Sequence, residues 1–355
     1  KHGFGFFRRE TASAMKTLVT GATGFLGSHV ARQLAARGER VRVLVRPSSD
    51  LRALDGLEAE RFVGDLRDAA SLGRALADVT RVFHVAADYR LWARNPREIY
   101  ESNVTGTRNL LEAARLAGVE KFVYTSTVAT IAVPRKDGLP DESTQSSVEE
   151  MIGHYKRSKF EAEQCAMRAA EAGLPVVIVN PTTPVGPGDW KPTPTGKIVV
   201  DFLNGRMPGY VDTGLNFVPV EDCAAGHLLA GERGRVGERY ILGGRNLTLK
   251  EVLDMLAAIS GLRAPRWKFP HAVAYVAAGV DAVVSSLMGR EPQIPLEGVR
   301  MARHRMFVNA SKAARELGFA HGPIEEALGR AVGWYENNGY VAARGAHAVA
   351  RAHAA

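Results

Sequence analysis

Residues 18–30 read LVTGATGFLGSHV, a short β-branched run followed by a glycine-spaced turn and then a helical pattern. Gly21 and Gly24 lack a Cβ atom, which lets backbone amides approach a pyrophosphate at a helix N-terminus, and Gly27 lets that helix pack closely on the strand. The spacing GxxGxxG has one residue more between its first two glycines than the usual dinucleotide fingerprint. The stretch therefore predicts a strand, turn and helix that bind a nucleotide.

The same alternation of strand and helix signals continues along the chain. Runs typical of short buried strands lie at 16–20, 41–45, 61–64, 82–85, 121–125, 176–180 and 239–242. Helical periodicity fills the gaps at 24–37, 69–77, 99–117 and 154–172. Strands that alternate with longer helices are the signature of a parallel sheet covered by helices. The sequence predicts an α/β fold, a doubly wound Rossmann-type sheet of about seven strands.

A change of rhythm after residue 180 predicts a second region. Prolines and glycines crowd residues 181–194, and helical periodicity returns at 248–260, 271–288 and 323–337. We expect a smaller, mainly helical C-terminal lobe that binds substrate over the carboxyl ends of the strands. The expected division is a disordered extension at 1–14, an NAD(P)-binding domain at 15–180 and 207–246, a substrate lobe at 181–206 and 247–341, and a frayed tail at 342–355.

Composition excludes several functional classes. The formal charge of +8 is spread along the 355 residues, with no basic block interleaved with aromatics, so no nucleic-acid partner is expected. Cys165 and Cys223 are the two cysteines and lie far apart without a CxxC pair, which predicts neither disulfides nor a metal site. No signal peptide is expected, and we predict a reducing, cytoplasmic location.

The most apolar long window covers residues 271–287. It contains Asp281 and is shorter than a bilayer span of about 20 residues. We expect a helix packed against protein rather than one docked on a membrane, and no stable membrane insertion.

Two charged residues after the strands bear on the cofactor. Arg46 ends the second strand where an acidic residue would hold the ribose 2′-hydroxyl of NAD, and a guanidinium there would pair with a 2′-phosphate instead. The sequence therefore favours NADP over NAD, unless Arg46 is an ordinary exposed arginine. Asp65 follows the third strand and either accepts from the adenine amino group or caps the next helix.

The catalytic candidates are Tyr155 and Lys159, one helical turn apart. A cation beside a phenol lowers its pKa from about 10 and prepares it to pass a proton. Ser126 and Thr127 follow the strand before that helix, where a hydroxyl could hydrogen-bond a substrate carbonyl. Alternatively, Ser126 and Thr127 only belong to a run of strand-forming Thr and Ser residues and have no role in catalysis.

These features, in this order, resemble the extended short-chain dehydrogenase/reductase family over nearly all of residues 15–340. The resemblance implies that Tyr155 is the acid/base, that Lys159 anchors the nicotinamide ribose, and that Thr127 polarises the carbonyl, with Ser126 as its competitor. Asn103 would brace the site. The cofactor residues implied are Gly21, Thr23, Gly24, Phe25, Leu26, Gly27, Arg46, Asp65, Leu66, Ala86, Ala87, Tyr155, Lys159 and Pro181, and no metal is expected.

Within the family, residues 82–109 look most like bacterial hopanoid-associated sugar epimerases, which are similar to dihydroflavonol reductases. Nucleotide-sugar epimerases often carry an Arg where this chain has Leu215, and this departure weakens a nucleotide-sugar substrate. Our leading hypothesis is an NADPH-dependent reductase of a small carbonyl compound. The alternatives are a sugar epimerase or dehydratase linked to hopanoid biosynthesis and, less favoured, a non-catalytic NADP sensor. A homodimer is compatible with the resemblance.

Overall fold

The computed structural model describes residues 16–131 and 138–342, so the predicted extension at 1–14 and all but the first residue of the predicted tail lie outside the described residues. The seven predicted strands are confirmed, each within one residue at either end. They are β1 (Lys16–Thr20), β2 (Arg40–Val45), β3 (Glu60–Val63), β4 (Arg81–His84), β5 (Lys121–Thr125), β6 (Val176–Pro181) and β10 (Arg239–Leu242).

All seven strands form one parallel sheet in the order β10-β6-β5-β4-β1-β2-β3. The chain builds outward from β1 to β3, then returns to β4 on the other side of β1 and continues to β10. The direction of strand addition therefore reverses between β1 and β4. In open α/β sheets ligands bind beside the carboxyl ends of the strands at such a reversal. The glycine turn follows β1, so the topology places it there.

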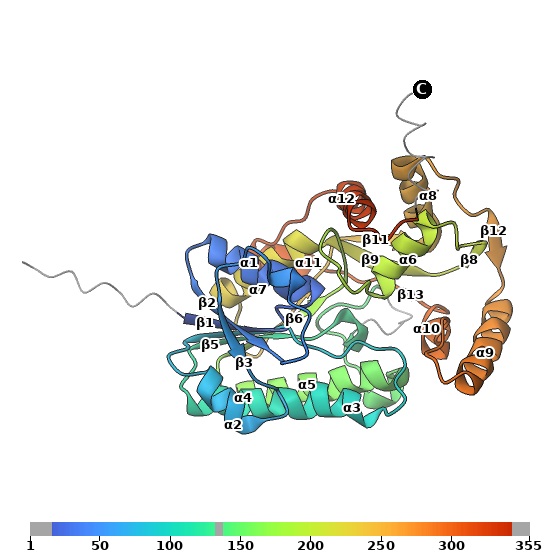
Figure 1. Ribbon diagram of the computed structural model, residues 1–355. Helices are drawn as coiled ribbons and strands as arrows, with labels where there is room; N and C mark the ends of the chain where they lie inside the picture. Colours follow the sequence, from blue (N-terminus) through green and yellow to red (C-terminus); the bar gives the residue numbers. More distant parts are fainter. Residues whose placement is uncertain (1–15, 132–137, 343–355) are drawn as a thin grey trace, which may run out of the picture.

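Helices cover both faces of the sheet (Figure 1). One face carries α1 (Phe25–Ala36), α7 (Val220–Arg233) and α11 (Ser311–Leu317), which share an apolar core with inward-facing residues of β1, β2 and β6. The other face carries α2 (Ala69–Ala75), α3 (Arg97–Tyr100), α4 (Gly106–Leu116) and α5 (Gly153–Glu171) over a second core. A π-helical turn, Glu101–Thr105, joins α3 to α4 inside the stretch that the sequence predicts as one helix.

The rest of the described chain forms a region with its own apolar core, built from α6, α8 and α12. Its helices are α6 (Pro194–Leu203), α8 (Leu249–Ser260), α9 (His271–Leu287), α10 (Leu296–Met301) and α12 (Ile324–Asn337). It also contains small sheets that sequence patterns did not predict. Their strands are β7 (Thr183–Val185), β8 (Gly209–Val211), β9 (Gly214–Pro219), β11 (Arg245–Thr248), β12 (Trp267–Phe269) and β13 (Arg305–Met306).

The expected domain boundaries stay a prediction. Two elements pack outside the domain to which the sequence assigned them. The strand β9 lies in the segment assigned to the NAD(P)-binding domain but pairs with β7, β11 and β13. The helix α11 lies in the segment assigned to the substrate lobe but packs with α7 and β10.

Residues 271–287 form the predicted helix, and it packs against protein along one side only. The helix forms as α9, but only Ala278 and Ser285 of its residues are buried. Its packing is largely with the short helix α10, which covers one narrow side. Among the described residues, no helix combines the length and the apolar character that a membrane crossing requires.

Candidate active site

The glycine turn after β1 is shaped by close backbone approach. Gly21 has a φ of 74°, and a Cβ atom there would lie 2.5 Å from the backbone nitrogen of Ala86, after β4. A Cβ atom on Gly27 would lie 2.1 Å from the carbonyl oxygen of Gly21. Gly21 therefore lets the turn lie against the loop after β4, and Gly27 lets the helix α1 pack closely on the turn, whereas the predicted approach of a pyrophosphate stays a prediction.

The first turn of α1 leaves its backbone amides open to an anion. Gly24 is the N-cap residue, no side chain caps the helix, and the first turn contains no acidic residue. Unpaired N–H groups and the positive end of the helix dipole together favour a phosphate. Thr23, Phe25 and Leu26 surround this end and are half-buried, so they border the same space.

Arg46 and Asp65 lie at the ends of β2 and β3. Arg46 is exposed, and within the described residues its guanidinium forms no hydrogen bond or ion pair. Asp65 accepts from Arg67 Nη2 at 2.7 Å, and this ion pair holds the pKa of the Asp65 carboxyl below its usual range. The suggestion that Asp65 caps the next helix is wrong, because Asp68 is that cap. The adenine contact stays a prediction.

Thr127 and Tyr155 meet where β5 and α5 converge. Thr127 is the N-cap of a short 3₁₀ turn, Val128–Thr130, and its side chain lies close enough to Tyr155 to act on the phenol. Burial raises the pKa of the Tyr155 phenol, and the nearby Thr127 side chain has a smaller effect in the opposite direction. The phenol therefore keeps its proton at neutral pH, which is the form that a proton donor needs.

Lys159 contacts other groups than the sequence predicts. Its Nζ donates to Tyr124 Oη at 3.0 Å and to the Thr125 carbonyl at 2.8 Å, and it lies 4.7 Å from the centre of the Tyr124 ring. The expected lowering of the Tyr155 pKa by Lys159 is thus wrong, since burial dominates at Tyr155. Burial also lowers the pKa of Lys159 to about 7.

Ser126 differs from its neighbour Thr127. Its hydroxyl is buried, with 5% of the residue exposed, and has no hydrogen-bond partner within the described residues. Adjacent residues of an extended segment point to opposite sides, and here Thr127 is the one that meets Tyr155. An unpaired buried hydroxyl has a free energy cost unless another group binds it.

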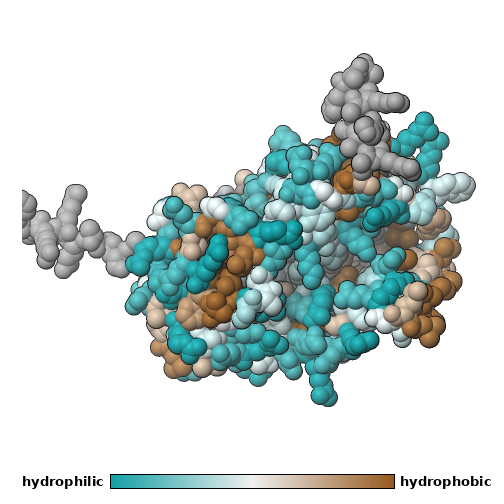
Figure 2. Space-filling view, in the orientation of Figure 1, coloured by the Kyte–Doolittle hydropathy of each residue, from teal (hydrophilic) through white to brown (hydrophobic). Residues whose placement is uncertain are grey.

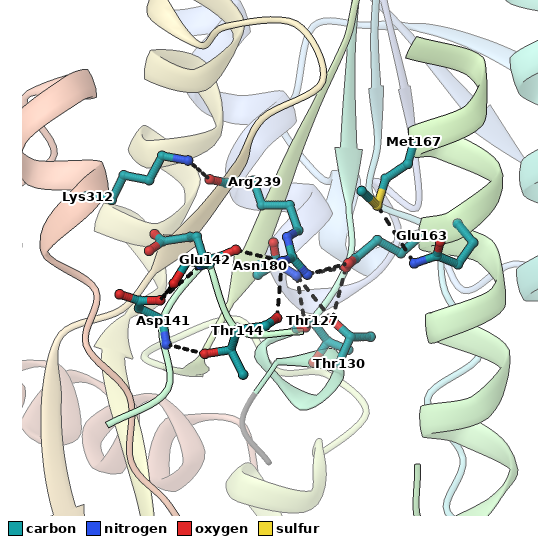
Figure 3. A network of polar contacts seen from close by, with 12 residues as sticks. Thr127, Thr130, Asp141, Glu142, Thr144, Glu163, Met167, Asn180, Arg239 and Lys312 are labelled. Carbon is teal, nitrogen blue, oxygen red and sulfur yellow. Dashed lines mark hydrogen bonds and ion pairs between the residues drawn. The ribbon is translucent and has the colours of Figure 1, made fainter. Parts of the chain in front are cut away.

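A buried polar network stabilises the segment that carries Thr127 (Figure 3). Asn180 Nδ2 donates to the Thr127 carbonyl at 3.1 Å and to Glu163 Oε2 at 2.9 Å. Thr130 Oγ1 donates to the same carboxylate oxygen at 3.0 Å, and Arg239 Nη1 forms an ion pair with the other oxygen at 3.3 Å. Because Glu163 is completely buried, these partners provide the charge compensation and hydrogen bonds that a buried carboxylate requires.

Sequence reasoning did not single out Glu163, although a signal was present. Glu163 follows Lys159 by four residues, as Lys159 follows Tyr155, so the three side chains lie along one side of α5. The carboxylate of Glu163 acts on Lys159 by raising its pKa, against the larger effect of burial. Tyr124, the hydrogen-bond partner of Lys159, was likewise missed.

Asn103 connects the helices below the site. It lies in the π-helical turn, and its Nδ2 donates to Ser158 Oγ and to the Asp88 carbonyl, both at 2.9 Å. Ser158 in turn donates to the Tyr155 carbonyl at 2.8 Å. The expected bracing contact of Asn103 therefore reaches the backbone of Tyr155 and the loop after β4. Single π-helical turns inside α-helices occur often at functional sites.

The remaining predicted cofactor residues are distributed around the sheet reversal. Ala86 contacts the glycine turn, and Ala87 follows it in the loop after β4. Leu66 follows β3 and lies against Gly106 of α4, and its carbonyl accepts from Asn109. Pro181 is the buried last residue of β6. Their contacts with a cofactor stay predictions.

The turn, the open helix terminus and the unpaired Ser126 hydroxyl fit a bound dinucleotide. Gly21 and Gly27 form a cradle that a Cβ atom would fill, and the first turn of α1 offers donors to a phosphate. Across residues 16–131 and 138–342, no group of three or more His, Cys, Asp or Glu side chains is placed to hold a metal ion. Both cysteines are buried and unpaired.

A nucleotide-binding turn at the sheet reversal, beside a tyrosine and a lysine on one helix, is the arrangement of NAD(P)-dependent oxidoreductases and epimerases, and the fold places the chain in that class. The chain belongs to the NAD-dependent epimerase/dehydratase family, whose model matches residues 17–243. It is an extended short-chain dehydrogenase/reductase that acts on small molecules.

Individual relatives span almost the whole chain. A putative dihydroflavonol 4-reductase from Synechocystis is 48% identical over 327 residues, which are 91% of this chain and 95% of the relative. Sterol demethylase protein B from Methylococcus capsulatus is 37% identical over 329 residues, 92% of this chain and all of the relative. The solved structure of a nucleoside-diphosphate-sugar epimerase from Pseudomonas aeruginosa is 31% identical, with a TM-score of 0.75, and covers 92% of this chain and 99% of its own.

Proposed function

We propose that the chain reduces a carbonyl group of a small organic substrate with NADPH, with Tyr155 as the proton donor. The observation that carries this proposal is the contact of the Tyr155 side chain with Thr127 at the convergence of β5 and α5. The two groups can then hydrogen-bond one carbonyl oxygen together, and the raised phenol pKa keeps the proton available.

The cofactor and the residues of the chain have separate roles in this reaction. The bound dinucleotide supplies hydride to the carbonyl carbon. Tyr155 gives its proton to the oxygen, so that an alcohol is formed, and Thr127 holds that oxygen in place. Lys159 binds the nicotinamide ribose, and Arg46 binds the 2′-phosphate of NADP. Network residues Asn180 and Glu163 hold the backbone that carries Thr127.

Two observations favour reduction over epimerisation. Leu215 packs in the apolar core of the C-terminal region, so it presents no group to a sugar diphosphate. Arg46 is exposed beside the expected position of the adenosine ribose, which favours the phosphorylated cofactor that reductases use. The reductase named among the relatives supports the same reaction, whereas the epimerase structure supports the alternative. The hopanoid link, a homodimer and the cytoplasmic location stay predictions.

The test is turnover of NADPH with a panel of aldehydes and ketones by wild-type protein and Tyr155→Phe. We expect Tyr155→Phe to bind NADPH nearly as wild type does but to turn over about 10² to 10⁴ times more slowly, the usual contribution of general acid catalysis. Full activity of Tyr155→Phe would contradict the role of Tyr155 as proton donor, whereas binding of NADPH without turnover of any carbonyl compound by wild-type protein would favour the sensor hypothesis.

Thr127→Val and Ser126→Ala form a matched pair that removes one hydroxyl each. We expect Thr127→Val to reduce kcat by roughly 10- to 150-fold, because a hydrogen bond to a charged transition state contributes about 1.5 to 3 kcal/mol. Ser126→Ala should reduce kcat far less. The reverse order would assign the role to Ser126.

A further inference from the structure

The outer side of α9 is an uninterrupted apolar face. It consists of Val273, Val276, Ala277, Val280, Val283, Val284 and Leu287. These positions recur every three or four residues, so they lie on one side of the helix. The exposed fractions of Val276, Val283 and Leu287 are 68%, 61% and 83%. Figure 2 shows apolar surface gathered where Figure 1 places α9.

The polar groups of this segment point inward and hold it in place. Asp281 accepts from Ser285 Oγ and from Arg290 Nη2, both at 3.1 Å, and from the backbone nitrogen of Ile294 at 2.8 Å. These bonds tie α9 to the segment leading into α10. The helix therefore faces solvent with its apolar side, the reverse of a surface helix that packs on a core.

The hairpin of α9 and α10 lies beside the active site. Glu297 on α10 accepts from the backbone nitrogen of His154 at 3.3 Å. A Cβ atom on Gly153 would lie 2.1 Å from a carboxylate oxygen of Glu297. Tyr155 is the next residue on α5 after His154. The apolar face is thus carried by an element in contact with the N-terminus of the catalytic helix.

Positive charge surrounds the apolar face. Residues 263–305 contain seven Lys or Arg residues and three Asp or Glu residues. Trp267, with 74% of its surface exposed, and the exposed residues Arg266 and Lys268 precede the helix. A groove at the helix N-terminus is lined by Lys268, His271, Arg303 and Arg305, and by one acidic residue, Asp212, which forms ion pairs with Lys268 at 2.8 Å and Arg305 at 2.9 Å.

We propose that α9 docks this protein on an anionic phospholipid membrane, lying in the plane of the interface. The aliphatic face would enter the boundary between headgroups and acyl chains, Trp267 would lie at the level of the headgroups, and the basic groove would bind lipid phosphates. A second copy of the chain is a poorer partner for this face, because pairing α9 with its own copy brings two basic flanks together.

The docking face goes beyond the proposed reaction, so it is tested without an activity assay. Wild-type protein is sedimented with sucrose-loaded vesicles of phosphatidylcholine alone or with 30 mol% phosphatidylglycerol, in roughly physiological salt. We expect binding to the anionic vesicles and a loss of that binding in high salt. The double variant Val276→Glu/Val283→Glu should bind at least about tenfold more weakly, since it places two carboxylates in the apolar face.

A matched control changes two exposed valines elsewhere. Val63 and Val236 have exposed fractions of 60% and 50% and lie outside the hairpin, so Val63→Glu/Val236→Glu makes the same change in charge. Circular dichroism confirms that each variant folds. The proposal requires that the control variant binds vesicles as wild type does.

Three results would overturn the proposal. Wild-type protein could stay in the supernatant with anionic vesicles, or both double variants could lose binding equally. Alternatively, wild type could ignore vesicles and sediment as a dimer in the ultracentrifuge, with Val276→Glu/Val283→Glu converting it to a monomer. That last result would assign the face to a second copy of the chain.

Discussion

Lys159 is an ammonium group held where water does not reach it. Only 2% of the residue is exposed, two of its three donors bond Tyr124 and Thr125, and burial lowers its pKa to about 7. The unfolded chain would protonate this group up to a pKa of about 10.4. Between these two pH values the unfolded state binds one proton more than the folded state, so stability increases with pH.

This difference predicts the pH dependence of folding. From pH 7 to 9 the free energy of unfolding of wild type should increase relative to that of Lys159→Met by about 1.4 kcal/mol per pH unit. Below pH 7 both states bind the proton, and the difference should be constant. Urea unfolding at pH 6, 7, 8 and 9 measures it. A parallel pH dependence of the two proteins would show that the lysine is not buried in this way.

Arg46 carries the prediction for cofactor choice. Its exposed guanidinium at the end of β2 is free, within the described residues, to form a charge-assisted bond with a 2′-phosphate. Such a bond contributes roughly 1.5 to 3 kcal/mol, or about a 10- to 150-fold preference. Arg46→Ala should therefore reduce the ratio of NADPH to NADH affinity by that factor, with NADH affinity almost unchanged. An unaltered ratio in titration calorimetry would refute the assignment.

At the scale of elements, the glycine turn allows a direct comparison. Gly21 and Gly38 both have a positive φ, of 74° and 77°, which is unfavourable for alanine at either position. A Cβ atom at Gly38 meets nothing within 4 Å, whereas at Gly21 it meets the backbone of Ala86. We expect Gly38→Ala to cost about 1 to 2 kcal/mol of stability and to leave NADPH binding intact.

Gly21→Ala should cost more stability and should weaken NADPH binding by at least about tenfold, because the loop after β4 must move. Thermal unfolding and NADPH titration of the two variants measure both effects. If Gly21→Ala bound NADPH as tightly as Gly38→Ala does, the turn would not be the cofactor site.

Elements with long periodic patterns could be predicted, and short ones could not. Most of the seven sheet strands are buried on both faces and follow apolar runs such as residues 176–180, although the edge strand β3 is mostly exposed. The strands β8, β12 and β13 have two or three residues, too few for any alternation to be visible. The exposure of α9 was also hidden, because an apolar helix has the same sequence whether protein or solvent covers it.

In the candidate site too, some contacts could be predicted from the sequence and others could not. Local spacing predicted the neighbours along one helix, Tyr155 and Lys159, and the sheet order explains why Thr127 lies beside them. Contacts between distant segments were not visible in the sequence. The ion pair of Glu163 with Arg239 joins residues 76 positions apart, and it depends on β6 and β10 being neighbours.

At the scale of the whole molecule, the sheet brings the glycine turn after β1 and the proposed proton donor on α5 to the same edge, with the C-terminal region beside them (Figure 1). This arrangement is compatible with net transfer of a hydride from cofactor to substrate, and also with removal of a hydride from the substrate and its return to the same substrate. A reductase releases the hydride in its product, whereas an epimerase returns it to its own substrate and releases a cofactor of unchanged redox state.

The most direct test follows that hydride. Wild-type protein is incubated with NADPH carrying deuterium at the transferable position and with the carbonyl compound that is turned over fastest in the panel. We predict one deuterium in each alcohol released and one NADP⁺ formed for each alcohol. Conversion of a nucleotide sugar to its epimer without net consumption of NADPH, together with no reduction of any carbonyl compound, would contradict the account.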